Sequence, residues 1–192
     1  MFAELLRKRI SPIIELSTTQ LGQLEHHYNL LIKWNKVLNL TSLHKVEEVV
    51  ERHYCESIFL AVHLPVGVSS IGDVGSGAGF PGIPVAIARP ECQVSLIESH
   101  QRKCVFLREA TRELTNVQVL PNRIEEVGRT FDWVVCRAVQ FSKIERSVSK
   151  NSPHIAVLGT QQPKAVRFTW NTLLQLPWGR QKYLWIGTRR ST

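Results

Sequence analysis

One stretch of the chain decides its fold: Asp73-Val74-Gly75-Ser76-Gly77-Ala78-Gly79-Phe80-Pro81-Gly82. A short apolar run, Ile71 to Val74, leads into it, and a helical pattern, Ile83 to Ala88, follows it. Glycine adopts positive φ angles and lets a ligand approach the backbone, while the first turn of a helix offers free NH groups. The stretch therefore predicts a ligand-binding loop between a strand and a helix.

Short β-branched runs continue to alternate with helical patterns after this loop. Four further strands are predicted at 94–97, 117–120, 133–135 and 155–158, with a helix at 101–114. Strands that alternate with helices pair in parallel through right-handed crossovers, and such sheets bind ligands at the carboxyl ends of their strands. We predict an α/β fold of the Rossmann-like type, with a mostly parallel, doubly wound sheet.

Helical patterns precede the sheet. The run Leu16 to Leu21 carries the signature of a capping box with a hydrophobic staple. Apolar residues then recur at helical spacing as far as Leu64. We expect an N-terminal helical extension, residues 1–66, packed on a core domain, residues 67–192.

The segment after Gly159 predicts a closing element at the C-terminal end of the sheet. We expect a helical stretch at 165–170, followed by two apolar runs, 173–176 and 183–186, around the turn 177–180. A turn that contains proline and glycine between two apolar runs is typical of a hairpin.

The charge and the cysteine content limit the class of protein to which the chain can belong. The 24 Lys and Arg residues outnumber 16 acidic ones, which gives a formal net charge of +8. Such an excess favours a polyanion such as nucleic acid, although a moderate positive charge also serves solubility alone. The four cysteines lack C-x-x-C spacing, so we expect neither a metal site nor a disulfide framework. No apolar segment resembles a signal peptide or a membrane span, which predicts a cytoplasmic protein.

An acidic residue, Glu98, ends the second predicted strand and indicates the class of ligand. A carboxylate at this position accepts hydrogen bonds from the two hydroxyls of a ribose. Dinucleotide binding favours a glycine where this chain has Phe80, and Asp73 beside the loop suits a ligand with an amino group. These features favour S-adenosylmethionine (SAM), bound by Asp73, Gly75, Gly77 and Glu98. The alternative is a glycine-rich turn that only packs a helix on the sheet.

Six blocks of sequence, in order, carry a resemblance to a known family. They are Trp34-Asn35-Lys36-Val37-Leu38-Asn39-Leu40-Thr41, Val49-Val50-Glu51-Arg52-His53, Asp73 to Pro84, Glu98-Ser99-His100-Gln101-Arg102-Lys103, Arg123-Ile124-Glu125 and Arg137-Ala138-Val139. With them the chain resembles the bacterial glucose-inhibited division protein B family, the guanine-N7 methyltransferases of small-subunit (16S) ribosomal RNA. The resemblance implies a class I methyltransferase fold, SAM as methyl donor and ribosomal RNA or the ribosomal subunit as partner. We expect the protein to act as a monomer.

The resemblance also implies particular site residues. The family contacts the cofactor at the positions of Gly75, Phe80, Ile124, Glu125 and Arg137. By the same resemblance, two basic residues of a matching block are candidates for binding RNA; they are Arg102 and Lys103. His53 lies on the apolar side of its predicted helix, and we interpret it as structural.

The implied reaction predicts what the site lacks. N7 of guanine carries an in-plane lone pair and no proton, so methyl transfer needs alignment and no general base. We therefore expect no catalytic triad, and Arg137 is the candidate for positioning the substrate. The fourth strand leads into Arg137-Ala138 without the Asp/Asn-Pro-Pro-aromatic motif of exocyclic-amine methyltransferases, which disfavours adenine-N6 chemistry.

Two residues depart from the family pattern and keep other functions open. Leu158 stands where the family usually has lysine, and Glu56 stands where it prefers aspartate. A SAM-binding or RNA-binding module of the same fold, weakened in catalysis and active in ribosome assembly or regulation, is therefore the alternative. A nucleotide-dependent oxidoreductase is a third hypothesis, which Phe80 disfavours.

Overall fold

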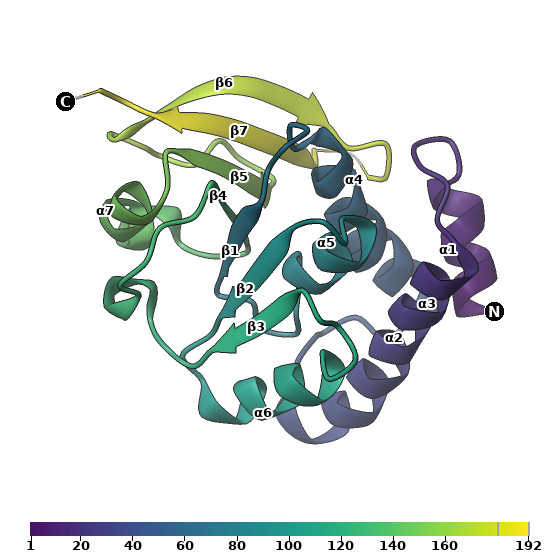
Figure 1. Ribbon diagram of the computed structural model, residues 1–192. Helices are drawn as coiled ribbons and strands as arrows, with labels where there is room; N and C mark the ends of the chain where they lie inside the picture. The colour runs from purple at the N-terminus through teal and green to yellow at the C-terminus, as the bar shows by residue number, and fades with distance from the viewer. Residues whose placement is uncertain (180, 192) are drawn as a thin grey trace.

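A seven-stranded sheet forms the centre of the computed structural model, which describes residues 1–179 and 181–191 (Figure 1). The strand order is β3-β2-β1-β4-β5-β7-β6, with β7 antiparallel to both of its neighbours and the other pairings parallel. The strands are β1 (Ser70–Val74), β2 (Gln93–Ile97), β3 (Val117–Leu120), β4 (Trp133–Arg137), β5 (His154–Gly159), β6 (Phe168–Gln175) and β7 (Tyr183–Arg189). The strand order reverses between β1 and β4, and such switch points form ligand-binding crevices.

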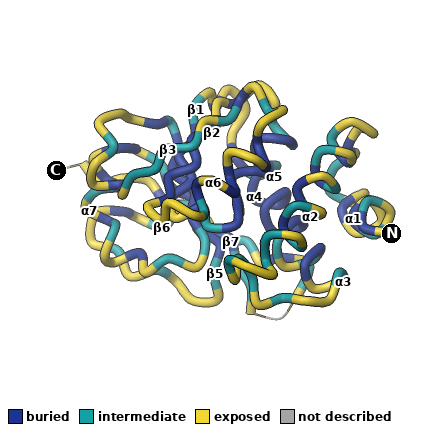
Figure 2. Tube along the Cα trace, turned by 90° about the horizontal axis from the view of Figure 1, so that it is seen from below, coloured by how far each residue is buried: buried dark blue, intermediate teal, exposed yellow. Residues whose placement is uncertain are grey.

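Helices cover both faces of the sheet, more thickly on one than on the other (Figure 2). They are α1 (Phe2–Ile10), α2 (Thr18–Leu38), α3 (Val46–Val49), α4 (Glu56–His63), α5 (Gly82–Ala88), α6 (Gln101–Ala110) and α7 (Phe141–Asn151), with a π-helical turn η1 (Val50–Cys55) and a 3₁₀ turn η2 (Ile124–Glu126). The first four, η1, α5 and α6 pack on one face, and α7 with η2 covers the other.

The strands distribute their apolar side chains between two clusters because successive residues of a strand point to opposite faces. In β4, Trp133 and Val135 join the cluster on the side of α5 and α6, whereas Val134 and Cys136 join the cluster under α7. Strand β5 alternates in the same way. The first cluster continues without interruption into α1 and α2, so the N-terminal helices and the sheet share one core.

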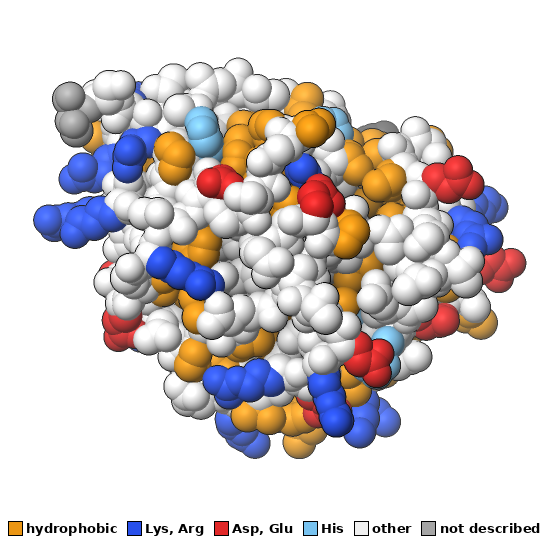
Figure 3. Space-filling model, in the orientation of Figure 1, with side chains coloured by type: hydrophobic (Ala, Val, Ile, Leu, Met, Phe, Trp, Pro, Cys, Tyr) orange, Lys and Arg blue, Asp and Glu red, His pale blue; other side chains and the backbone are white. Residues whose placement is uncertain are grey.

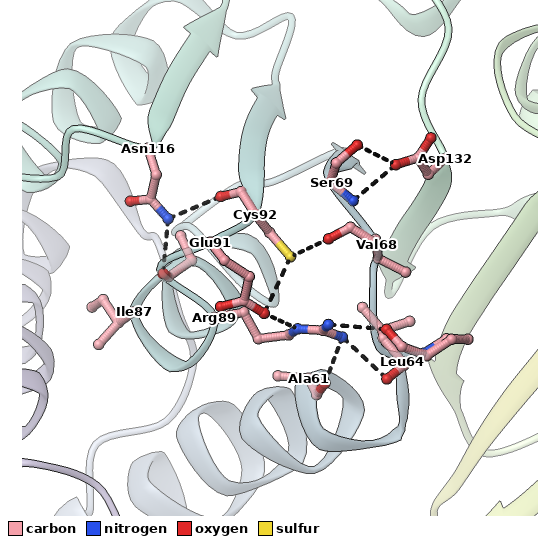
Figure 4. A network of polar contacts seen from close by, with 12 residues as sticks. Ala61, Leu64, Val68, Ser69, Ile87, Arg89, Glu91, Cys92, Asn116 and Asp132 are labelled. Carbon is pink, nitrogen blue, oxygen red and sulfur yellow. Dashed lines mark hydrogen bonds and ion pairs between the residues drawn. The ribbon is translucent and has the colours of Figure 1, made fainter.

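A polar network fastens the amino-terminal edge of the sheet (Figure 4). The Arg89 guanidinium donates to the carbonyl oxygens of Leu64 at 3.1 Å and Pro65 at 2.9 Å, and it also pairs with Glu91. Asp132, just before β4, accepts hydrogen bonds from the backbone NH and hydroxyl of Ser69, just before β1. The opposite edge, where the parallel strands end, is left for the site.

The sequence predictions agree with most of this architecture. The α/β fold, the parallel strands, the capping box of α2 and the C-terminal hairpin are confirmed, although Arg180 of the expected turn lies outside the described residues. The helix expected at 165–170 is wrong, because β6 begins at Phe168 and its β-branched and aromatic residues pair with β7. Helix α6 ends at Ala110, four residues before the predicted end.

Candidate functional site

The loop after β1 keeps the left-handed backbone that its glycines predict. Gly75, Gly77 and Gly79 have φ angles of +73°, +56° and +87°. Gly75 is exposed, and a Cβ atom added to it would lie 2.8 Å from Cγ1 of Val139. The loop therefore presents bare backbone at a place where a side chain would collide with its surroundings.

Glu98 closes the loop from the end of β2. One carboxylate oxygen accepts the backbone NH of Gly77 at 2.9 Å, and the other accepts that of His100 at 2.8 Å. Each carboxylate oxygen has two acceptor sites, so these two bonds leave one site on each oxygen. The carboxylate is thus held rigidly and still has capacity for two hydroxyl groups.

Asp73 is fully buried beneath the same loop. Its Oδ2 atom accepts the backbone NH of Gly82 at 3.0 Å, which ties β1 to the start of α5. Its Oδ1 atom is buried and has no hydrogen-bond partner among the described residues. Burial raises the pKa of this carboxyl to about 7. Asp73 therefore has a structural bond on one oxygen and an unused acceptor on the other.

The N-terminal helices hold the loop from behind. His27 of α2 lies 3.0 Å from the carbonyl oxygen of Ala78 through Nε2 and 3.0 Å from the hydroxyl of Tyr54 through Nδ1. A carbonyl only accepts, so Nε2 carries the proton and Nδ1 accepts from the tyrosine. Burial lowers the pKa of His27 to about 4, in keeping with this neutral ring.

The side chain of Phe80 points into these helices. Its ring stacks on His53 with a centroid distance of 4.5 Å and meets Tyr54 edge-on at 5.1 Å. Only 6% of Phe80 is exposed. Its ring therefore anchors the loop on the helical layer and is turned away from solvent, and the cofactor contact expected at this position stays a prediction.

A cleft of about 480 Å³ opens beside the loop, at the ends of β4 and β5. Val139, which faces Gly75, lines it, and so does Arg137. The Arg137 guanidinium lies 3.5 Å from Oε2 of the buried Glu56, and Lys182 lies 4.0 Å from Oε1 of the same carboxylate. Burial raises the pKa of Glu56, and the two cations oppose that rise.

The backbone is strained where it enters this cleft. Ala138, which follows β4, has a φ of +53°, a conformation that costs an alanine about 1 kcal/mol. Such outliers persist where the surrounding structure enforces them, and they cluster at functional sites. The turn at Ala138 leads the chain from Arg137 past Gly75, which keeps the loop and the cleft adjacent.

Comparison with known proteins identifies the family to which these features belong. The sequence profile of the family described as rRNA small subunit methyltransferase G matches residues 20–159. The chain belongs to this family. A relative from Chromobacterium violaceum named ribosomal RNA small subunit methyltransferase G is 38% identical over 82% of this chain and 79% of its own length. Another of that name, from Nitrosomonas europaea, is 46% identical over 67% of this chain and 60% of its own length.

Solved structures similar to this member of the small subunit methyltransferase G family support the fold alone. A mitomycin 7-O-methyltransferase gives a TM-score of 0.63 at 15% identity, covering 85% of this chain and 60% of its own. A SAM-dependent methyltransferase from Aquifex aeolicus gives 0.58 at 13% identity, covering 83% of this chain and 98% of its own. No helix within residues 1–179 and 181–191 is long and apolar enough to cross a membrane, and these residues hold no group of three or more potential metal ligands.

The site residues expected for a member of this family fall into separate groups. Asp73, Gly75, Gly77 and Glu98 lie together at the loop, and Arg137 lies in the adjoining cleft. Ile124 and Glu125 lie in η2, after β3; Ile124 is buried, whereas Glu125 is exposed on the wall of a different depression. Arg102 and Lys103 lie in the first turn of α6, shortly after Glu98.

Sequence reasoning assigned no role in the site to three residues that shape it. His27 continues the buried face of α2 formed by Leu24 and Leu31, and a polar residue on such a face was the available signal. Glu56 is fully enclosed at the end of η1, where the local π-helical geometry gives no sequence signature. Lys182 enters the cleft from the hairpin, and only the pairing of β7 with β5 brings it there.

Proposed function

We propose that this chain transfers the methyl group of SAM to N7 of a guanine in small-subunit ribosomal RNA. The observation that carries the proposal is the exposed glycine loop with a rigid carboxylate, Glu98, directly beside a basic cleft. Membership of the small subunit methyltransferase G family supports the same reaction. In this proposal the nucleoside of SAM binds at the ends of β1 and β2, and the guanine that accepts the methyl group binds in the adjoining cleft at the ends of β4 and β5.

The residues of the loop fit a SAM molecule. Glu98 has one free acceptor site on each oxygen for the two ribose hydroxyls, and Gly75 lets the cofactor approach the backbone. Ile124 and Glu125 would flank the adenine from η2, and the buried carboxylate of Asp73 would attract the amino group electrostatically from beneath the loop. When bound, SAM supplies an electrophilic methyl group on its sulfonium.

Arg137 in the cleft and the nearby His53 suit a transfer that needs no general base. Burial and the charge of Arg137 lower the pKa of His53 to about 3, which makes its ring a weak proton acceptor. Arg137 offers a planar set of donors for orienting an anionic or carbonyl group. Alignment of the guanine lone pair with the methyl group is then the main contribution of the protein.

The RNA is proposed to approach over the carboxyl-terminal edge of the sheet. Arg102 is exposed there in the first turn of α6, next to Lys103. Figure 3 shows Lys and Arg side chains along the lower rim of the molecule, where α6 lies. Because N7 is hidden in the deep groove of A-form RNA, we propose that the target guanine lies in a loop or junction. We propose that the protein acts in the cytoplasm, where this substrate is found, and that it acts as a monomer.

Transfer of labelled methyl groups tests the proposal. The protein is incubated with labelled SAM and with RNA or small subunits from a strain that lacks this modification, and the labelled base is mapped by cleavage at N7-methylguanine. Label at one guanine is the expected result. Label on adenine, on protein or on no macromolecule would contradict it.

The absence of a charged side chain at Leu158 favours one second candidate. The buried leucine contributes only carbon to the cleft wall, so the chain would bind SAM and RNA as an assembly factor without turnover. Complementation of a deletion strain distinguishes the two functions. A SAM-binding but inactive protein that restores subunit assembly would support this candidate, and restored methylation would exclude it.

A further inference from the structure

The cleft beside the loop carries more positive charge than its surroundings neutralise. Among the described residues that line it, the charged ones are Arg52, Arg137, Lys164, Lys182 and Glu56. Four cations therefore face one carboxylate. Arg52 and Lys164 are exposed, whereas Arg137 and Lys182 approach the buried Glu56 from two sides. The excess charge favours an anionic ligand.

The donors at the base of the cleft are not used up within the protein. Nη1 of Arg137 is buried and has no hydrogen-bond partner among the described residues. Nη2 of Arg137 lies 3.5 Å from Oε2 of Glu56, and Nζ of Lys182 lies 4.0 Å from Oε1 of Glu56. Both distances are longer than that of a good charged hydrogen bond, about 2.8 Å. Glu56 thus holds the two cations near each other without saturating either one.

The place of Lys182 in the fold explains why it reaches this cleft. Gly159 at the end of β5 pairs with Tyr183 at the start of β7, so the residue before β7 lies beside the carboxyl end of β5. Figure 1 shows this end of the hairpin close to α4, which Glu56 begins. Leu158, on the neighbouring wall, brings no charge. The second partly buried cation of the cleft therefore comes from the hairpin.

We propose that Lys182 and Arg137 form a phosphate-binding site for the RNA, in which Lys182 acts as a positioning residue for the target nucleotide. The inference rests on the proposed function and specifies its acceptor side. Arg137, which the family resemblance predicts as a cofactor contact, would instead bind phosphate oxygens from the base of the cleft through its unpartnered Nη1, and Lys182 would add a point charge. Glu98, the carboxylate proposed to bind the ribose, follows β2, whereas these cations lie beside the ends of β4 and β5. The nucleoside part of the cofactor would therefore bind away from them.

Binding of RNA without catalysis provides the first test. Affinity for a fragment of unmodified small-subunit RNA is measured at several salt concentrations for the wild type, Lys182→Ala and Lys182→Arg. We expect Lys182→Ala to bind about tenfold more weakly, the size expected for loss of one charged hydrogen bond. Its salt slope should decrease by roughly 0.7 to 0.9, because one phosphate contact is lost. Lys182→Arg should retain most of the affinity.

A matched control removes the same charge elsewhere. Lys33 is exposed on α2 and does not line the cleft, so Lys33→Ala should leave both affinity and salt slope near the wild-type values. Thermal unfolding of each variant verifies the fold, and Lys182→Gln replaces the alanine variant if that one is unstable. Equal RNA affinity and salt slope in the Lys182 and Lys33 variants would overturn the proposal.

Titration with SAM shows whether the cleft binds the phosphate of RNA or the carboxylate of the cofactor. We expect the same SAM affinity in the wild type and in Lys182→Ala, together with a higher KM for RNA and a smaller effect on kcat. A loss of SAM affinity with unchanged RNA binding would assign the cleft to the cofactor and contradict the proposal. If the wild type binds RNA through Lys182 and transfers no methyl group, the proposed function fails while the phosphate site stands.

Discussion

At the scale of single residues, Gly75 combines a constrained backbone with exposure to solvent in the proposed site. It has a left-handed backbone, it is exposed, and it has no room for a Cβ atom beside Val139. We expect Gly75→Val to abolish SAM binding, as measured by calorimetry. Gly67 has a similar φ of +86° and open space around it, so Gly67→Val imposes comparable backbone strain away from the site. Equal SAM affinity in the two variants would contradict the loop assignment.

His27 predicts a pH dependence of stability. Its pKa is about 4 in the folded protein and near 6.5 when unfolded, so the unfolded chain binds more protons between these values. The stabilisation is complete above about pH 6.5 and is lost as the pH falls, by roughly 2 kcal/mol at pH 5.

Urea unfolding at several pH values isolates this contribution. Glutamine at position 27 keeps an NH donor for Ala78 but does not titrate in this range. We expect the free energy of unfolding of His27→Gln to decrease less than that of the wild type between pH 7 and pH 5. Parallel pH profiles for the two proteins would show that His27 does not titrate as its burial requires. The comparison cancels the opposing titration of Asp73, which is common to both.

At the scale of elements, α6 places positive charge next to the nucleoside site. Arg102 lies in its first turn, directly after the segment that contains Glu98, and Arg112 lies beyond its last turn. Both are exposed, and neither has an ion-pair partner among the described residues. We expect Arg102→Ala to weaken RNA binding several-fold in a filter-binding assay, whereas Arg112→Ala changes it less. SAM affinity should stay the same in both variants. An equal loss of RNA affinity in the two variants would show that only the overall positive charge matters and would contradict a specific role of Arg102.

The elements also show which structural features a sequence can reveal. Strands β1, β2 and β3 are short, apolar and flanked by turns or helices, so their pattern predicts them well. Helix α7 is absent from the predicted elements although Phe141, Ile144 and Val148 recur at helical spacing, and its buried residues also include polar ones, which interrupt the apolar pattern; they are Glu145, Ser149 and Asn151. The start of β6 looked helical because its pairing with β7, which decides its structure, is not a local property.

The candidate site was predictable to a similar extent. The loop and Glu98 follow from local patterns and their order along the chain, and the family resemblance is confirmed. The burial of the Phe80 ring, the neutral His27 and the meeting of Lys182 with Glu56 depend on contacts between segments distant in sequence. The roles of Ile124, Glu125, Arg102 and Lys103 stay predictions.

At the scale of the whole molecule, the helical layer and the sheet form one apolar core behind the site. The layer reaches the loop through His27 and through the ring of Phe80, so it fixes the loop from the side opposite the proposed cofactor. The division into residues 1–66 and 67–192 stays a prediction about folding units. The continuity of the core leads us to expect that loosening of α2 also loosens the glycine loop.

The central claim is that the loop from Asp73 to Gly82, together with Glu98, forms the SAM site. A crystal structure of the protein with SAM tests it most directly. We predict that the ribose hydroxyls bind the two oxygens of Glu98 and that the cofactor passes over the exposed backbone of Gly75. SAM bound elsewhere, or a loop in this conformation that leaves no space for it at saturating concentration, would contradict the account.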